Sequence, residues 1–364
     1  MMMAYKLILF FCLYSMSFSK DVEYSNISDS WFLKYKFFDN NLFYIENRND
    51  VGCERMFYNY DYGKNKLDSF EIELPLVGKY NCERSKDYIK DFEINDSILI
   101  IFYNYYIFFY NKSGNSYIFN KFIDLKVKIY REGIDKRVGT RIILKDSLLI
   151  GFQDSYLSTD FAKNYLFAWK FNLCNEVVDT FKFNEPTGYQ WTLLQPKEIL
   201  DYYQGTFVFS DVDDDNIYLY KDRIQKIDLN IFMNKKQFIS DTLKYHSTGS
   251  FFSMNQGLID SIYLIHKVSF LDSENILIAY SIPNLNFENK IHVFRYCLLI
   301  FNSNQWEVLP IENTDKIFGL IDNYSYGVFY EISNGMLISN HINSKNNFIR
   351  IEKINDIIQR IRKK

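Results

Sequence analysis

Short apolar runs separated by polar turns recur along almost the whole chain, and few stretches show the spacing typical of a helix. The clearest example spans residues 91–119, where Phe92 and Ile94 alternate with charged residues. Its segments are an alternating stretch at 91–94, a polar turn at 95–97, apolar runs at 98–103 and 105–110, a turn at 111–115 and a further run at 117–119. This pattern predicts four antiparallel strands that follow one another as a meander.

The same pattern returns along the chain, with starts near residues 40, 95, 145, 205, 272 and 322. A single four-stranded sheet cannot bury both of its apolar faces, whereas sheets packed side by side around an axis bury them and leave only short edges. The repeat therefore predicts an all-β fold, a β-propeller of about six four-stranded blades, with residues 20–364 as a single domain. A pair of β-sandwiches with accidental spacing is the alternative.

Three segments add detail to this prediction. Residues 196–203 are expected to form one or two helical turns, because Pro196 is favoured at the first position of a helix. The stretch 31–38 is a candidate for the strand that closes the ring with the last blade. Near the C-terminus, a short amphipathic helix is predicted over about 351–362, or else a continuation of the last strand, from the spacing of Ile351, Ile354, Ile358 and Ile361.

The composition supports strands and excludes some partners. The chain has 34 Phe and 30 Tyr, which favour pleated and half-buried surfaces, but only 5 Pro and 14 Gly, so Asn, Asp and Ser are expected in the turns. The net charge is −3, and basic residues form no stripe along the chain. A nucleic-acid partner is therefore not expected.

The N-terminus predicts export. Lys6 precedes an uninterrupted apolar run at 7–14, and Ser17 and Ser19 stand at the positions that signal peptidase requires for a cut before Lys20. We therefore expect a signal peptide at 1–19 and a secreted, periplasmic or cell-surface protein; a buried N-terminal strand is the alternative. No later segment has the roughly 18 uncharged apolar residues of a membrane span, so no transmembrane segment is expected in the mature chain.

Removal of the signal peptide leaves four cysteines, Cys53, Cys82, Cys174 and Cys297. An even number of cysteines in an exported chain is compatible with disulfides, and three pairings are open. Cys53 and Cys82 are the closest pair in the sequence and flank one predicted hairpin, so a bridge between them is the first candidate. Isolated buried thiols are the alternative.

Two short motifs resemble a known group of propellers. The sequence Asp-Asp-Asn-Ile-Tyr at 214–218 is similar to the start of a blade strand, and Phe-Gly-Leu-Ile-Asp occurs at 318–322 near the last blade. With the aromatic strands, they resemble the secreted bacterial six-bladed propellers of the TolB-like or NHL-like type. That resemblance implies a binding or scaffold role, although the cysteine that anchors many of those proteins to lipid has no counterpart here.

Candidate chemistry is sparse. Asp211, Asp213 and Asp215 alternate in a run that could wrap oxygen ligands around Ca²⁺, or that simply forms a solvated acidic turn. No other cofactor is expected, because the four histidines form no zinc-binding spacing and the chain has no nucleophile motif or phosphate-binding glycine loop. Trp191 lies in a polar stretch and is the candidate ligand-binding aromatic, with a core position as the alternative.

These observations predict an exported, non-enzymatic binding or scaffold protein that presents one propeller face to a protein or glycan. A propeller hydrolase that acts on polysaccharide or glycoconjugate, with acidic residues near the central channel, is the alternative. Two convergent carboxylates about 5–10 Å apart would favour hydrolysis, because glycosidases act with such pairs. The identity of the ligand is not encoded in any recognisable motif.

Overall fold

The computed structural model of the chain describes residues 20–23, 34–45, 54–75, 89–103, 106–125, 141–153, 167–183, 198–210, 216–229, 264–282, 293–311, 330–342 and 347–363. These residues form six four-stranded antiparallel sheets and one C-terminal helix. The sheets belong to two units of the chain. The first unit holds strands β2 to β21, and the second holds β1, β22, β23, β24 and the helix.

Five sheets make up the first unit, and each consists of four strands in chain order. Blade 1 contains β2 (Lys34–Phe38), β3 (Asn41–Ile45), β4 (Glu54–Asp61) and β5 (Lys66–Glu73). Blade 2 contains β6 (Ile89–Ile94), β7 (Ile98–Tyr103), β8 (Tyr106–Ser113) and β9 (Ser116–Asp124). Blade 3 contains β10 (Arg141–Lys145), β11 (Leu148–Gln153), β12 (Phe167–Asn172) and β13 (Val178–Lys182).

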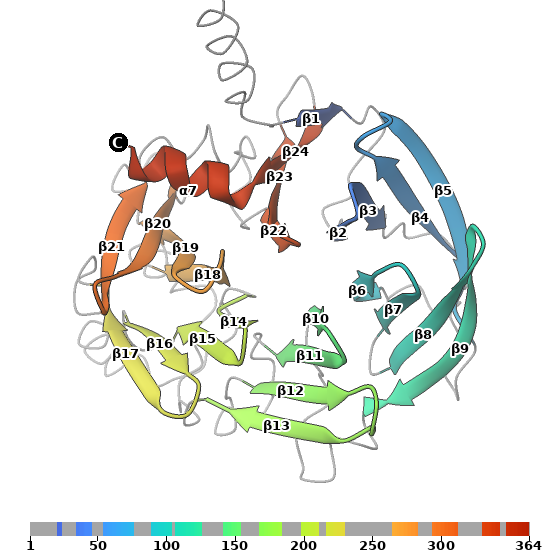
Figure 1. Ribbon diagram of the computed structural model, residues 1–364, viewed down its shortest axis with the longest axis horizontal. Helices are drawn as coiled ribbons and strands as arrows, with labels where there is room; N and C mark the ends of the chain where they lie inside the picture. Colours follow the sequence, from blue (N-terminus) through green and yellow to red (C-terminus); the bar gives the residue numbers. More distant parts are fainter. Residues whose placement is uncertain are drawn as a thin grey trace, which may run out of the picture. The chain divides into compact units, whose positions relative to one another are not determined.

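The remaining blades of this unit have the same order. Blade 4 contains β14 (Leu200–Tyr203), β15 (Thr206–Ser210), β16 (Asn216–Tyr220) and β17 (Ile224–Asp228). Blade 5 contains β18 (Leu264–Phe270), β19 (Asn275–Ile282), β20 (Val293–Asn302) and β21 (Gln305–Ile311). Within the unit, the first strand of each blade lies innermost and the fourth lies at the outer edge (Figure 1). The fold class is therefore the predicted β-propeller of six four-stranded blades, and the pair of β-sandwiches is excluded.

The second unit contains the sixth blade and the helix. Its strands are β22 (Tyr330–Ser333), β23 (Met336–Ile342), β24 (Asn347–Lys353) and β1 (Lys20–Glu23), and the helix α7 (Ile354–Arg362) follows β24 directly. The N-terminal strand β1 pairs with β24, which places residues from the two ends of the chain in one sheet. The helix buries Ile354, Ile357, Ile358 and Ile361, which agrees with its predicted amphipathic face.

Three expectations from the sequence need correction. The segment 31–38 does not close the last blade, because its described part is β2, which pairs with β3; β1 is the strand added to that blade. Residues 200–203 form β14 rather than a helical turn, because they pair with β15 in a buried sheet. The helix begins at Ile354, since residues 351–353 complete β24.

The apolar core lies between neighbouring blades, because alternate residues of each strand point to opposite faces of the sheet. In β7, Leu99 and Ile101 pack with blade 1, whereas Ile100 and Phe102 pack with blade 3. Besides these two apolar clusters, a third cluster of buried apolar residues joins blades 3, 4 and 5. The continuous apolar run at 98–103 is explained by this arrangement, since a blade covered on both faces needs apolar residues at every position.

The hairpin turns inside the blades rely on polar residues, as the low glycine content predicts. The backbone φ angle is positive at Asp39, Asn40 and Asp146, and Asn and Asp tolerate this conformation better than other residues with a side chain. In the turn between β6 and β7, the Asn95 side-chain oxygen accepts from the Ser97 and Ile98 amides at 2.9 and 3.0 Å. The turns at 39–40 and 95–97 set the register of their hairpins without glycine, whereas the turns that contain Gly114, Gly205 and Gly335 use a glycine with positive φ.

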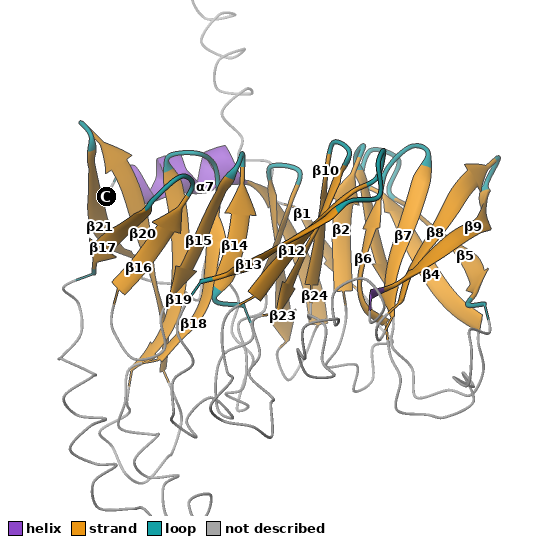
Figure 2. Ribbon diagram, turned by 90° about the horizontal axis from the view of Figure 1, so that it is seen from below, coloured by secondary structure: helices purple, strands orange, loops and turns teal. Residues whose placement is uncertain are grey.

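The two faces of the first unit differ in how the strands are joined. At one face, short turns such as 39–40 and 95–97 join the first strand of each blade to the second, and equally short turns join the third to the fourth (Figure 2). The strand ends that flank all other connections of this unit lie at the opposite face; these connections include 126–140, 184–197 and 230–263. We call these two sides the hairpin face and the connection face.

We predict that Gly151→Ala destabilises the protein strongly. A Cβ atom at Gly151 would lie 2.0 Å from the indole carbons Cε2 and Cζ2 of Trp169, which is fully buried. The indole must therefore move within a close-packed core, and we expect a loss of roughly 3 kcal/mol in the free energy of unfolding. Denaturant unfolding measures this loss. Gly63→Ala is the matched control, because its new Cβ would come no closer than 3.4 Å to Asp61; equal stability of the two variants would contradict the prediction.

Candidate functional site

Buried charges recur on the innermost strands of the first unit. The side chains involved lie on β2, β6, β10, β14 and β18, at the inner edge of blades 1 to 5. We call this group the inner-strand charges; its members are Lys36, Asp91, Glu93, Arg141, Asp201, Lys267 and Glu198, the last of which lies just before β14. A buried charge is costly unless it is paired and hydrogen-bonded, so the partners of these groups determine what the centre of the unit can do.

Asp91 links three consecutive blades. Its Oδ2 lies 3.4 Å from the Lys36 ammonium of blade 1 and accepts from the Ile142 amide of blade 3 at 2.8 Å. Its Oδ1 accepts from the amide of the next residue, Phe92, at 2.9 Å. The Lys36 ammonium also contacts the Ile142 carbonyl oxygen at 3.4 Å. One carboxylate therefore joins a cation from the preceding blade to the inner strand of the following blade.

Asp201 repeats this arrangement two blades further along the chain. The Arg141 guanidinium of blade 3 lies 3.3 Å from Asp201 Oδ1 and donates to the Leu200 carbonyl at 2.6 Å. Asp201 Oδ2 accepts from the Phe270 amide of blade 5 at 2.8 Å. Burial raises the pKa of Asp201, and the positive charge of Arg141 opposes that effect. Blades 3, 4 and 5 are thus joined in the same way as blades 1, 2 and 3.

Glu198 and Lys267 form a further contact between blades 4 and 5. The Lys267 ammonium contacts Glu198 Oε2, and the Val268 amide donates to the Glu198 carbonyl at 2.9 Å. Burial acts to raise the pKa of Glu198, but the combined positive charge of Lys267, Lys34 and Arg141 outweighs it and lowers the pKa to about 2. These three cations come from blades 5, 1 and 3, so the inner strands of separate blades come within electrostatic reach of one carboxylate.

Glu93 shares its cation with Asp91. The Lys36 ammonium lies 2.8 Å from Glu93 Oε1, and the side chain of Glu93 is 14% exposed. Burial raises the pKa of Glu93 to about 7; the Lys36 charge opposes this shift and the Asp91 charge adds to it. Because one ammonium contacts both carboxyl groups, Asp91 and Glu93 are held close to each other at the inner edge of blade 2.

The chemistry available to this group is limited by its internal contacts. Glycosidases act with two neighbouring carboxyl groups, so the proximity of Asp91 and Glu93 alone would permit hydrolysis. However, both carboxylates bind the same ammonium, and Asp91 is also held by two backbone amides. Among the described residues, no group of three or more His, Cys, Asp or Glu side chains is placed to hold a metal ion. The arrangement is that of a structural ionic network.

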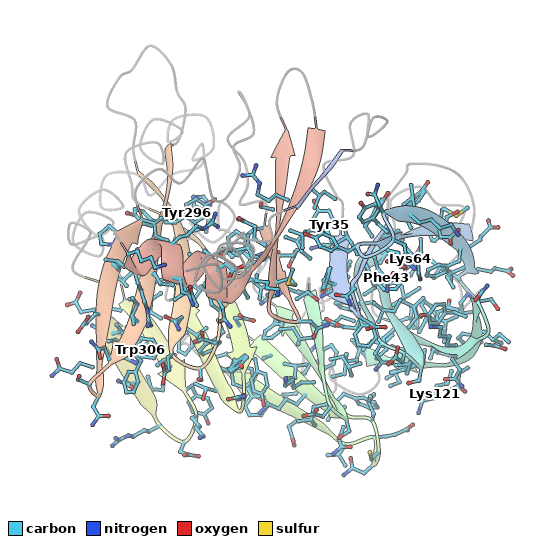
Figure 3. All side chains as sticks on the ribbon, turned by 45° about the horizontal axis from the view of Figure 1, so that its top comes forward. Tyr35, Phe43, Lys64, Lys121, Tyr296 and Trp306 are labelled. Carbon is cyan, nitrogen blue, oxygen red and sulfur yellow. The ribbon has the colours of Figure 1, made fainter. Side chains whose placement is uncertain are left out.

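Ion pairs at the outer edge of the blades differ from these. Lys121 lies on β9, the outer strand of blade 2 (Figure 3). Its ammonium lies 2.6 Å from Glu176 in the turn after β12, but the two side chains are 42% and 49% exposed. Water screens such a pair, and exposed pairs contribute about 1 kcal/mol or less. The inner-strand charges are shielded from that screening, so their pairing affects stability more strongly.

The site residues singled out in the sequence lie outside the described residues. This applies to Trp191, to the calcium candidates Asp211, Asp213 and Asp215, and to the disulfide candidates Cys53 and Cys82. All of them fall in connections whose flanking strand ends lie at the connection face. Of the other two cysteines, Cys174 is an exposed free thiol and Cys297 is a buried one, and burial raises the pKa of Cys297 to about 12.

The inner-strand charges escaped the sequence analysis, although a signal for them exists. Each stands inside or beside the apolar strand that begins its blade, as Lys36 does between Tyr35 and Phe37. A charge in such a place is expected either to be paired or to be on an exposed face, and the spacing of a single strand does not distinguish these cases. The partners belong to other blades and are therefore distant in the sequence.

We predict that neutralising Asp201 costs much more stability than neutralising an outer carboxylate. Asp201→Asn keeps the side-chain volume but removes the negative charge that lies 3.3 Å from the buried Arg141 guanidinium, so we expect a loss of about 3 kcal/mol in the free energy of unfolding. The matched control Glu176→Gln removes the exposed pair with Lys121 and should cost less than about 1 kcal/mol. Denaturant unfolding compares the two; similar losses would contradict a special role for the inner strands.

No protein-family model and no curated protein matches the chain. Among solved structures, it is similar to a luciferin-regenerating enzyme (7% identity, 92% of this chain and 95% of that chain, TM-score 0.47). It is also similar to the β-propeller domain of the Trilobed protease from Pyrococcus furiosus (11% identity, 90% of this chain and 84% of that chain, TM-score 0.39). A further similar structure is the acylaminoacyl peptidase of Pyrococcus horikoshii (13% identity, 91% of this chain and 47% of that chain, TM-score 0.39). The expected resemblance to six-bladed propellers is confirmed as a fold, and the strand order of the chain itself establishes it.

Proposed function

We propose that this chain is an exported, non-enzymatic binding or scaffold protein that presents its connection face to a protein or glycan. One observation carries the proposal: each described carboxylate among the inner-strand charges is bound to a cation of another blade. A general acid or a nucleophile needs a carboxyl group that substrate can reach, whereas these groups hold blades together. The centre therefore serves as a rigid support for surfaces elsewhere.

The connection face is the favoured binding surface. The hairpin face is formed by tight turns with side chains that are already engaged, such as Asn95 and Asn172, which bond to the amides that follow them. The longer connections join strand ends at the opposite face, and they include the segments with Trp191 and with Asp211, Asp213 and Asp215. Long connections on a rigid framework are where binding residues concentrate in proteins, so these segments stay the candidates for ligand and Ca²⁺ contact.

Export is part of the same proposal. A cut before Lys20 would remove the apolar run at 7–14 and would leave β1 whole, because that strand begins at Lys20. The pairing of β1 with β24 would then hold the new N-terminus in the sixth blade. In the described part of the chain, no helix is long and apolar enough to cross a membrane. An oxidising compartment would also allow the proposed bridge between Cys53 and Cys82.

A propeller hydrolase is the second candidate, and the pair formed by Asp91 and Glu93 is the observation that favours it. Their proximity suits glycoside hydrolysis, and the pKa of Glu93 near 7 would let it act as a general acid. The Lys36 ammonium between them argues for the structural role, since substrate would have to displace it. Activity towards oligosaccharides, lost in Glu93→Gln, would favour this candidate over the first.

We predict that Trp191→Ala weakens ligand binding at least tenfold. The purified protein is first applied to arrays of immobilised glycans and peptides, and the strongest hit is measured by calorimetry for each variant. Loss of an aromatic stacking surface is expected to reduce affinity by this factor. Ile224→Ala is the matched control, because Ile224 is 56% exposed at the start of β17 on the hairpin face. Equal binding by both variants, or no binding to either array, would contradict the proposal.

A further inference from the structure

Lys36, Asp91 and Glu93 form a group whose charges do not balance. One ammonium lies 2.8 Å from Glu93 and 3.4 Å from Asp91, and the side chains of Lys36 and Asp91 are 9% and 3% exposed. If both carboxylates were ionised, this buried group would carry one excess negative charge. Two carboxylates in such a site do not both ionise readily, and one of them is expected to keep a proton to a higher pH.

Among the described residues around Glu93, Lys36 is the cation whose charge acts on its pKa. Across the ladder on β7, Glu93 faces Ile100, which is apolar and fully buried. From β10, the group that meets Glu93 is the Leu144 backbone amide, and Arg141 on the same strand is directed to Asp201. Lys90, the cation on β6 itself, lies over the Phe102 ring, 5.3 Å from its centroid.

The hydrogen bonds indicate which of the two carboxyl groups takes the proton. Asp91 accepts from the Phe92 and Ile142 amides as well as from Lys36, and amides stabilise the ionised form of the carboxyl group. Glu93 accepts from Lys36 and from the Leu144 amide. Asp91 therefore has the larger set of donors and is the acceptor between blades, and Glu93, which has fewer donors, is the group that changes its protonation state.

We propose that Glu93 is a proton-binding site which makes the packing of blades 1, 2 and 3 dependent on pH. With a proton on Glu93, the Lys36 ammonium and the Asp91 carboxylate form a balanced pair at the junction of the three inner strands. When Glu93 loses that proton, the junction holds an excess negative charge and Lys36 is shared between two carboxylates. The proton thus strengthens the junction, and its loss weakens it.

The sign and the range of this effect follow from linkage between proton binding and folding. Burial raises the pKa of Glu93 from 4.5 to about 7, so the folded chain binds this proton more tightly than the unfolded chain does. The stabilisation is therefore complete below pH 4.5 and is lost as the pH rises to about 7. Glu198, whose pKa is lowered to about 2, acts in the opposite sense and only below pH 4.5. The two effects are thus separated in pH.

We predict that Glu93→Gln removes a large part of the pH dependence of unfolding between pH 5 and 8. In the unaltered protein, titration of Glu93 should raise the unfolding equilibrium constant by roughly a hundredfold over this range. Glutamine stays uncharged, so the variant should lack this component and should be more stable than the unaltered protein at pH 8. Glu71→Gln, which changes an exposed glutamate of β5, is the matched control and should keep the original profile.

Denaturant unfolding of the purified chain at several pH values measures these profiles. A Glu93→Gln profile as steep as that of the unaltered protein would overturn the proposal. A direct readout that needs no variant at this position is the carboxyl carbon resonance of labelled Glu93, which should titrate near pH 7. In Lys36→Met, loss of the ammonium should move this midpoint to higher pH, whereas a midpoint near pH 4.5 in either protein would overturn the proposal.

Discussion

Each four-stranded sheet of this chain has two apolar faces, and neither can be left in water. In the first unit, the constraint is satisfied by neighbouring blades, whose alternate residues fill the space on each side, as Leu99 and Ile100 of β7 do. The strands at the inner edges belong to different sheets, so besides the backbone bridge between Glu198 and Lys267 a connection through side chains joins them. Asp91 and Asp201 supply that connection, since each one binds a cation from the blade before it and a backbone amide from the blade after it.

The same arrangement determines the electrostatics of the centre. Charges shielded from water interact strongly, so the balance of each local group matters more than the total charge of the chain. Arg141 and Lys267 both act on Asp201, three cations act on Glu198, and Asp91 and Glu93 share the Lys36 ammonium. Burial acts to raise the pKa of both Glu93 and Glu198; three cations outweigh it at Glu198 and lower that pKa, whereas the single Lys36 ammonium does not outweigh it at Glu93. A structural network can therefore contain one group that responds to pH near neutrality.

In this framework, the residues that hold the blades together are different from those for which we propose a binding role. The inner strands are occupied by contacts between blades, and the hairpin face is built from tight turns with satisfied side chains. Variation in length and composition is left to the connections at the other face, where insertions do not disturb the ladders. The proposed binding role follows from this division, because residues in the connections can change without loss of the packed blades.

The sequence by itself determined the class of fold, the number of blades and the place of many strands. Continuous apolar runs such as 98–103, polar turns such as 95–97 and the isoleucine spacing of α7 are local patterns, and they reflect local hydrogen bonds and burial. Tertiary structure alone decided that β1 joins the last blade, that 200–203 form a strand, and that Asp91 and Asp201 meet cations from other blades. Pairing between residues distant in the sequence depends on how whole sheets pack, and no pattern within one strand records which partner its buried charge will meet.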